Sequence, residues 1–247
     1  MLPVALEAAT KVVQAFLYSG KEYVCVMQLH ADVPNSTLVR VMREFTGEIY
    51  QKPPLRASVK RAPRKRFIYQ LDILEIDGRT VLFKCSCQAG TYIRKLCSDV
   101  GEVISCGAHM RELRRTRAGP FTEETRLTTL HDLSAAQEEF EKGNELPMRH
   151  IIQPMELALR PFPQIILRDS AVDSICHGAT LAIPGIAKIE TSVEKGKPVA
   201  LFTLKGEAVA LGRVLLSMND MVDQDKGLAV RPERVLMERG TYPALWK

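Results

Sequence analysis

Residues 67–88, FIYQLDILEIDGRTVLFKCSCQ, contain the strongest local pattern in the 247-residue chain. Apolar and polar residues alternate on both sides of Asp77-Gly78, and an Asp-Gly pair between alternating runs is typical of a tight hairpin turn. The pattern therefore predicts two antiparallel strands, one over residues 67–77 and one over residues 80–88.

Helices and another strand are predicted on either side of this hairpin. Downstream, Gly90-Thr91 leads into a predicted helix that begins near Tyr92. Its apolar residues recur at the three- to four-residue spacing of a helix face, as do those of the other predicted helices. The remaining elements expected in this half of the chain are a helix over 2–18, a strand over 23–33, and helices over 36–46 and 127–142.

A change of texture near Pro161-Phe162-Pro163 predicts a domain boundary. The chain after it contains short apolar runs separated by glycine and proline, which is typical of short strands joined by turns. One short helix is predicted over residues 169–176. We therefore expect two domains, residues 1–160 and a small β-rich module over residues 161–247.

Composition excludes several classes of protein. Apolar residues make up 46% of the chain and charged residues 26%, as in ordinary globular proteins, so a disordered chain, a collagen or a coiled-coil rod is excluded. No apolar run approaches the roughly 18–20 residues of a membrane span. The six cysteines form no C-x-x-C pair and the histidines no H-x-x-x-H spacing, so no metal site or cofactor is expected. A reduced, intracellular chain is predicted.

The net charge of +5 is concentrated in two segments. Close packing of like charges is costly unless a polyanion lies nearby, and phosphates are the usual partner. The alternatives are a solvated loop and, in the second segment, pairing with acids such as Glu123 and Glu124. The first segment, a proline-rich stretch predicted to be an extended loop, contains Lys52, Arg56, Lys60, Arg61, Arg64, Lys65 and Arg66; the second contains Arg111, Arg114, Arg115 and Arg117.

Several strings occur in an order that resembles the TruB-type pseudouridine synthases, and dyskerin and its archaeal counterparts in particular. They are LPVALEAATK (2–11), KEYVCVMQLH (21–30), QKPPLRASVKR (51–61), GTYIRKL (90–96) and GAHMRELRRTRAGPF (107–121), followed by DSAVDSICHGATLAIPGI (169–186). The resemblance covers nearly the whole chain. It implies an α+β fold: a mixed-sheet synthase domain followed by a small β-barrel PUA domain that binds RNA.

The resemblance also implies an activity and partners. The expected reaction is the isomerisation of uridine to pseudouridine in rRNA or tRNA, without a cofactor. In dyskerin-like members a box H/ACA guide RNA and small ribonucleoprotein subunits select the uridine. The chain ends without a long lysine-rich tail, so a cytoplasmic, archaeal-type protein is expected, with nucleolar residence as the alternative.

Residue by residue, the resemblance implies a uracil pocket. Tyr23 would stack on the flipped base, Arg94 would hold the nucleophilic carboxylate, and Tyr92 would assist proton removal from C5. Leu113 would form an apolar wall, although alone it would be an ordinary core leucine. The basic segments would follow RNA phosphates, and His177, Gly178 and Ala179 would face RNA in the PUA module.

One feature of the family is not found in the sequence. The family's catalytic aspartate lies in an SGTLDP-like segment a few residues before the LPVAL string, and here Leu2 already belongs to that string. The expectation is an N-terminally truncated chain that does not catalyse unaided, in which Arg94 has no acid of its own chain to hold. A non-catalytic RNA-binding scaffold is therefore the alternative function.

Overall fold

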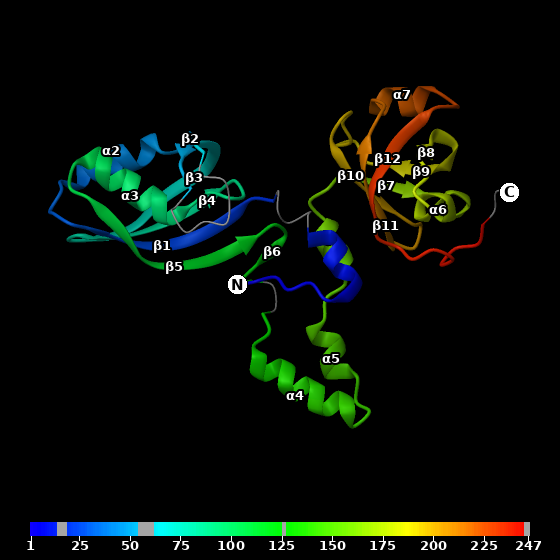
Figure 1. The fold of residues 1–247 in the computed structure, drawn as a ribbon, viewed down its shortest axis with the longest axis horizontal. Helices are drawn as coiled ribbons and strands as arrows, with labels where there is room; N and C mark the ends of the chain where they lie inside the picture. Colours follow the sequence, from blue (N-terminus) through cyan, green and yellow to red (C-terminus); the bar gives the residue numbers. More distant parts are fainter. Residues whose placement is uncertain (14–18, 54–61, 125–126, 245–247) are drawn as a thin grey trace. The chain divides into compact units, whose positions relative to one another are not determined.

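The computed structural model describes residues 1–13, 19–53, 62–124 and 127–244 (Figure 1). Contacts divide the chain into a first unit, residues 1–3 and 16–127, and a second unit, residues 4–15 and 128–247. This division differs from the predicted boundary at residue 160 because two segments before it are bonded to the C-terminal strands. Lys11 Nζ donates to the Leu236 carbonyl at 3.3 Å, and the Ala208 amide donates to Glu156 Oε1 at 3.1 Å.

The first unit is built on a six-stranded sheet in the order β2-β3-β4-β1-β5-β6. The predicted hairpin is confirmed: β3 and β4 pair antiparallel, with Asp77 opposite Thr80. Every pairing among the described strands of this sheet is antiparallel. The strands are β1 Lys21–Leu29, β2 Gly47–Gln51, β3 Arg64–Asp77, β4 Thr80–Cys87, β5 Ala108–Ala118 and β6 Phe121–Thr122.

Two helices, α2 (Asn35–Glu44) and α3 (Ile93–Ile104), pack on one face of this sheet (Figure 1). Alternate strand residues such as Cys25 and Phe83 point into the core between the sheet and the helices, and both are fully buried. The helix α3 packs mainly against β5 and also touches β1, and Gly101 near its end lies close to Ala108 at the start of β5. The sheet face under α3 is therefore where the predicted pocket residues should meet.

The second unit contains a six-stranded sheet in the order β8-β12-β11-β10-β7-β9, with a parallel β7–β10 pair. The strands at its two edges, β8 and β9, are joined by the three-residue turn η3 (Ile183–Gly185), so the sheet curls until it is nearly closed. This confirms the small β-barrel and the α+β class. The strands are β7 Gln164–Leu167, β8 Leu181–Ala182, β9 Ile186–Ile189, β10 Pro198–Phe202, β11 Ala208–Val214 and β12 Leu228–Val235.

Two helices of the second unit follow the sequence pattern, and its other helical segments after residue 128 were not predicted. The helix α6 (Asp169–Cys176) matches its prediction, and α4 (Leu130–Glu141) begins with a capping box between Thr129 and Asp132. The other helical segments are η1 Glu7–Val12, α5 Leu146–Ile151, η2 Met155–Leu159 and α7 Met218–Asp223. No helix among the described residues has the length and hydropathy to cross a membrane.

The helix predicted over residues 2–18 is wrong in its described part. Only the short 3₁₀ helix η1 forms, and residues 14–18 lie outside the described residues. Leu6 is extended, and Glu7 has a positive φ of 46°, which a continuing right-handed helix does not permit. Among the described apolar residues of this segment Val12 is buried, whereas Val4 is 72% exposed, so the apolar spacing does not correspond to one packed face.

Candidate functional site

Three of the predicted site residues share the helix-bearing face of the first sheet. Tyr23 of β1 follows the same alternation as the buried Cys25, so both side chains point to that face. On the neighbouring strand β5, Arg115 lies opposite Tyr23 and Leu113 lies opposite Cys25. Leu113 is not a core leucine, since 42% of it is exposed. A half-buried tyrosine, an apolar wall and a cation therefore meet at one place.

The Tyr23 hydroxyl is held in its neutral form. Burial raises the pKa of Tyr23, the nearby Cys87 raises it further, and the hydrogen bond and charge of Arg115 only partly oppose this. Arg115 is itself fixed, because its Nε donates to the Met1 carbonyl at 3.0 Å and its own carbonyl accepts from the Met1 amino group at 3.1 Å. The N-terminal residue thus lies beside the cation that contacts Tyr23.

Tyr92 stands in the turn between β4 and α3, where it is the N-cap residue of α3. The Thr91 hydroxyl donates to the Gln88 carbonyl at 2.7 Å, and it also hydrogen-bonds Cys87, which lies beside Tyr23. The backbone of Tyr92 is held from the other side by Gln51, at the end of β2. The sheet face that carries Tyr23 and Leu113 is called the pocket face. This turn therefore joins the pocket face to β2, the strand before the first basic segment.

Arg94 lies in the first turn of α3 and is exposed. Within the described part of the chain its side chain makes no hydrogen bond or ion pair, although its neighbour Lys95 pairs with Asp99. An arginine at a helix start gains nothing from the helix dipole, so its position there has no local explanation. No contact joins Arg94 to Tyr23, and its role as the holder of a carboxylate stays a prediction.

The first basic segment is only partly described. Arg56, Lys60 and Arg61 lie outside the described residues, whereas Arg64, Lys65 and Arg66 do not form the predicted loop but begin strand β3. Lys52 is exposed. Lys65 pairs with Glu48 at 2.9 Å and lies over the Tyr50 ring, yet 62% of its side chain is exposed. Arg66 has its Nε bonded to the Gly90 carbonyl at 3.0 Å.

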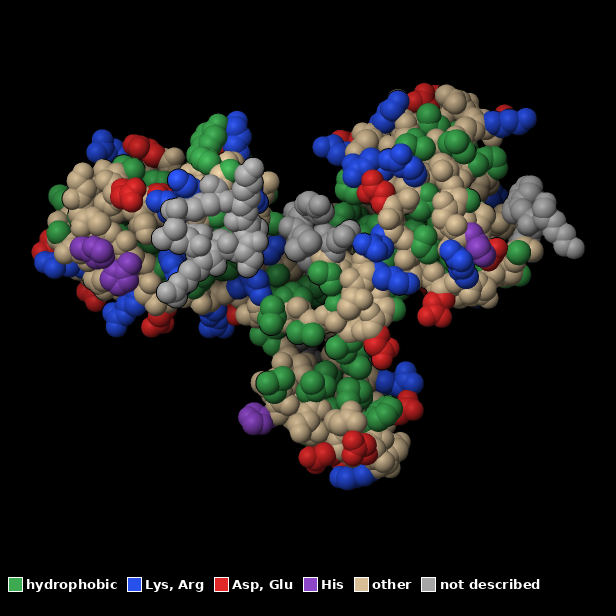
Figure 2. All heavy atoms as spheres, viewed as in Figure 1, with side chains coloured by type: hydrophobic (Ala, Val, Ile, Leu, Met, Phe, Trp, Pro, Cys, Tyr) green, Lys and Arg blue, Asp and Glu red, His purple; other side chains and the backbone are tan. Residues whose placement is uncertain are grey.

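The second basic segment belongs to β5, and besides Arg115, which is bonded to Met1, two of its arginines are paired with the chain itself. Arg114 pairs with Glu123 at 2.8 Å, which was one of the alternatives considered from the sequence. Most of the Arg114 side chain remains exposed. Arg117 donates to the Ser86 hydroxyl at 2.8 Å. Figure 2 shows acidic side chains interspersed with the basic ones on the visible face of the first unit. Phosphate contacts by this segment stay a prediction.

In the second unit, His177, Gly178 and Ala179 follow the end of α6. His177 Nδ1 lies 2.9 Å from the Asp173 carbonyl, and Gly178 has a φ of 89° with open space around its Cα. His177 and Gly178 line a hollow of about 380 Å³ together with Lys11 and Arg239. The hollow is therefore bordered by two cations and a histidine, and also by the carboxylate of Glu238.

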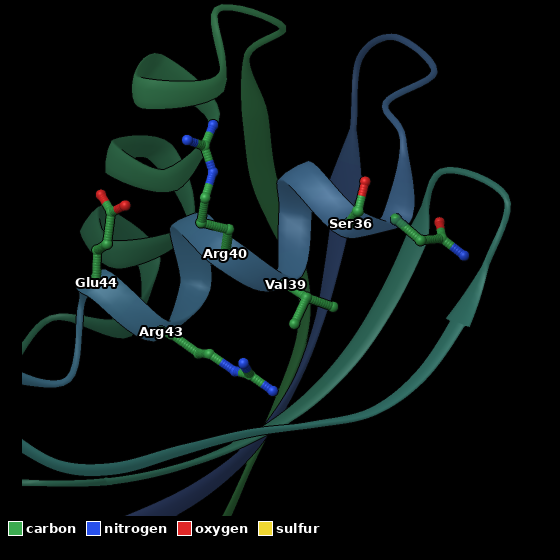
Figure 3. A pocket seen from close by; sticks show the side chains of 6 residues that line it. Ser36, Val39, Arg40, Arg43 and Glu44 are labelled. Carbon is green, nitrogen blue, oxygen red and sulfur yellow. The ribbon is translucent and has the colours of Figure 1, made fainter.

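Another hollow, of about 640 Å³, lies along the outer side of α2 and contains none of the predicted residues (Figure 3). Arg40 and Arg43 project from it in different directions, beside Ser36 and Glu44. All of its lining residues come from one helix or the residues at its ends. It shows no convergence of reactive groups and is separate from the pocket face.

Two features of the pocket were missed by the sequence analysis. One is Gln51, which no sequence pattern marks as a functional residue. Four fully buried cysteines, Cys25, Cys85, Cys87 and Cys97, lie under the pocket face, with the Cys25 and Cys97 sulfurs 3.7 Å apart. A hydrogen bond with Cys25 and burial raise the pKa of Cys97, so this thiol stays protonated. Each of these contacts joins distant parts of the chain, and no sequence spacing indicates them.

Family models cover nearly all of the chain. The N-terminal domain of the TruB family of pseudouridylate synthases matches residues 1–93, the C-terminal domain of tRNA pseudouridylate synthase B matches residues 94–160, and the PUA domain matches residues 163–236. Relatives named "Probable tRNA pseudouridine synthase B" are 56% identical in Methanopyrus kandleri and 52% identical in Pyrococcus horikoshii. Each matches all of this chain, which spans 73% and 74% of their lengths.

Solved structures show the same fold. A Cbf5-Nop10-Gar1 complex contains a chain 51% identical to this one, with a TM-score of 0.92 over 98% of this chain and 74% of that chain. An H/ACA RNP bound to a substrate RNA containing 2′-deoxyuridine contains one 48% identical, with a TM-score of 0.89 over the same shares.

Proposed function

The chain belongs to the TruB family of pseudouridylate synthases, and from this premise we propose that it isomerises uridine in RNA at the sheet face that carries Tyr23, with Tyr92 and Arg94 completing the site. The reaction breaks the C1′–N1 bond, turns the base and joins C1′ to C5, after which the C5 proton leaves to solvent and N1 takes up a proton. The base must first leave its stack, which costs a few kcal/mol. Stacking on the Tyr23 ring offsets about 1–3 kcal/mol of that cost.

The observation that carries the site is the cross-strand pair of Tyr23 and Arg115, with Met1 bonded to Arg115. In the family, the nucleophilic aspartate precedes the LPVAL string by a few residues. A carboxylate placed shortly before Leu2 would arise beside Tyr23. Arg94, which has no acidic partner in the described part of the chain, is the cation proposed to keep that carboxylate ionised and aimed.

We further propose that a box H/ACA guide RNA and small partner proteins choose the uridine, with rRNA or tRNA as the substrate class. The support is the likeness to chains solved in a Cbf5-Nop10-Gar1 complex and in an H/ACA RNP with substrate RNA. The cations Lys52, Arg64 and Lys65 would contact backbone phosphates of this RNA. In the second unit, the hollow at His177 and Gly178 would receive another RNA segment.

The test is release of tritium from RNA labelled at uridine C5, with the chain alone and with guide RNA and partner proteins added. The proposal predicts release when an SGTLDP-like segment before Leu2 supplies the family's aspartate, and Arg94→Met should then lower the rate by roughly 10²–10³-fold because the stabilising charge is removed. Arg40→Met, an exposed arginine on α2, is the matched control and should release tritium at the unaltered rate.

The alternative function is an RNA-binding scaffold without turnover, favoured by the lack of an acidic partner for Arg94 among the described residues. Tight RNA binding with no tritium release in any combination would support the scaffold and overturn the enzyme proposal. Equal release by Arg94→Met and the unaltered chain would refute the role given to Arg94.

A further inference from the structure

The two strands that border the first basic segment are both bonded to the same turn, residues 88–92. On the β2 side, Gln51 bonds Tyr92. On the β3 side, the Gln88 amide donates to the Phe67 carbonyl at 2.8 Å, and Gln88 Oε1 accepts from the Phe67 amide at 3.1 Å. The turn that carries Tyr92 and leads into α3 is thus held between β2 and β3.

The side-chain amide of Gln51 uses both its donor and its acceptor on the backbone of one residue, Tyr92. Its Nε2 donates to the Tyr92 carbonyl at 3.1 Å, and its Oε1 accepts from the Tyr92 amide at 2.9 Å. Only 2% of Gln51 is exposed, so water cannot replace either bond. The primary amide therefore pairs with Tyr92 as a neighbouring strand would, and it fixes the distance from β2 to the start of α3.

Arg66 makes the matching contact from β3. Its Nε donates to the Gly90 carbonyl at 3.0 Å and its Nη1 to the Lys65 carbonyl at 2.8 Å. Gly90 has a φ of 80°, and a Cβ there would lie 3.1 Å from Arg66 Nη2. The backbone conformation thus favours a glycine, and a Cβ there would press on the end of the Arg66 side chain.

We propose that Gln51 and Arg66 are positioning residues for the isomerisation, which set the place of Tyr92 and Arg94 by holding the backbone of the turn. Neither residue is required to touch the uracil. The inference rests on the proposed function for its kinetic part and assigns to Arg66 a role different from the phosphate contact expected from the sequence.

The first experiment compares Gln51→Met with Gln70→Met, an exposed glutamine of β3 that does not contact the turn. Methionine keeps the length of the side chain and removes both bonds. The Tyr92 amide should lose protection against hydrogen exchange in Gln51→Met alone. The kcat for tritium release should fall on the order of 10²-fold, as expected for a small misplacement of reacting groups, while RNA affinity stays unchanged. Unchanged protection and kcat would overturn the proposal.

The second experiment uses Arg66→Lys, which keeps the charge at a partly exposed position and so preserves the fold and the electrostatic attraction of RNA. A positioning role predicts a lowered kcat with the same salt dependence of RNA binding. If Arg66 instead contacts a phosphate, Arg66→Gln should lower the salt slope of RNA binding by roughly 0.7–0.9 and leave kcat unchanged. That result would refute the assignment of Arg66 as a positioning residue. If the unaltered chain releases no tritium, the proposed function fails, yet exchange at Tyr92 still decides the role of Gln51.

Discussion

Gly101 of α3 is the residue whose substitution should most directly disturb the support of the pocket. A Cβ built there would lie 2.2 Å from the Ala108 amide nitrogen and 2.5 Å from the Gly107 carbonyl carbon. Both are backbone atoms, which cannot rotate away as a side chain would. The Gly101 carbonyl also accepts hydrogen bonds from the amides of Cys106 and Gly107, at 3.2 and 3.0 Å.

Two opposing effects decide the outcome of Gly101→Ala. Alanine stabilises a helix interior by about 1 kcal/mol relative to glycine. Relief of the clash requires α3 to move away from β5, and overpacking of this kind costs about 1–3 kcal/mol. Weakening the two hydrogen bonds at the Gly101 carbonyl adds about 1 kcal/mol for each bond. The clash therefore wins, and the free energy of unfolding should fall by about 2–4 kcal/mol.

The assay is urea unfolding of the first unit, monitored by circular dichroism. The control is Ser98→Ala on the same helix. The control should change the free energy of unfolding by no more than about 0.5 kcal/mol. Gly101→Ala should also slow tritium release, because α3 carries Arg94. A variant as stable as the unaltered chain would show that α3 can leave β5 freely, and the account of how the pocket is held would be wrong.

Three further outcomes are expected. Lys65→Gln should lower the salt slope of RNA binding by roughly 0.7–0.9, measured by titrations at several salt concentrations; an unchanged slope would exclude a phosphate contact. Because the folded-state pKa of Tyr23 is raised by burial, its contribution to stability is present below about pH 10 and is lost above it. Tyr23→Phe should remove a step above about pH 10 from the ultraviolet titration, and an unchanged titration would contradict this. Hydrogen bonds from Tyr242 and Thr203 lower the pKa of Glu207, so this carboxylate stabilises the second unit above the ordinary glutamate pKa, and that stability is lost in acid. In Tyr242→Phe the free energy of unfolding should fall less steeply as the pH is lowered. An unaltered pH dependence would contradict this role of the Tyr242 hydrogen bond.

The parts of the fold that the sequence predicted well are those with local signals. The Asp77-Gly78 hairpin has alternating residues and a turn pair within one window, and α6 has helical periodicity bounded by Gly178. The N-terminal helix failed because one residue, Glu7, takes a positive φ that no spacing announces. No strand was predicted over the residues of β5, because its arginines lie on both faces of the strand and hide the alternation of apolar and polar residues.

The residues of the candidate site also divide into those with a local sequence signal and those without one. Tyr23, Tyr92 and Arg94 were found because each lies in a short string that resembles the family. Gln51 was missed because its partner lies 41 residues further along the chain, and the pairing exists only once β2 and α3 have been placed. Its signal is burial of a polar side chain, which is a property of the assembled fold and not of any segment.

The sulfur-rich floor beneath the pocket supplies the first unit with a built-in reporter. Cys25, Cys85, Cys87 and Cys97 are fully covered, so a thiol reagent can reach them only when the sheet and α3 come apart. Cys176 is covered within the second unit. Identifying the alkylated cysteines by peptide mass over time, with the partly exposed Cys106 left out, would therefore time the opening of each unit separately, in an unmodified chain and without an added dye.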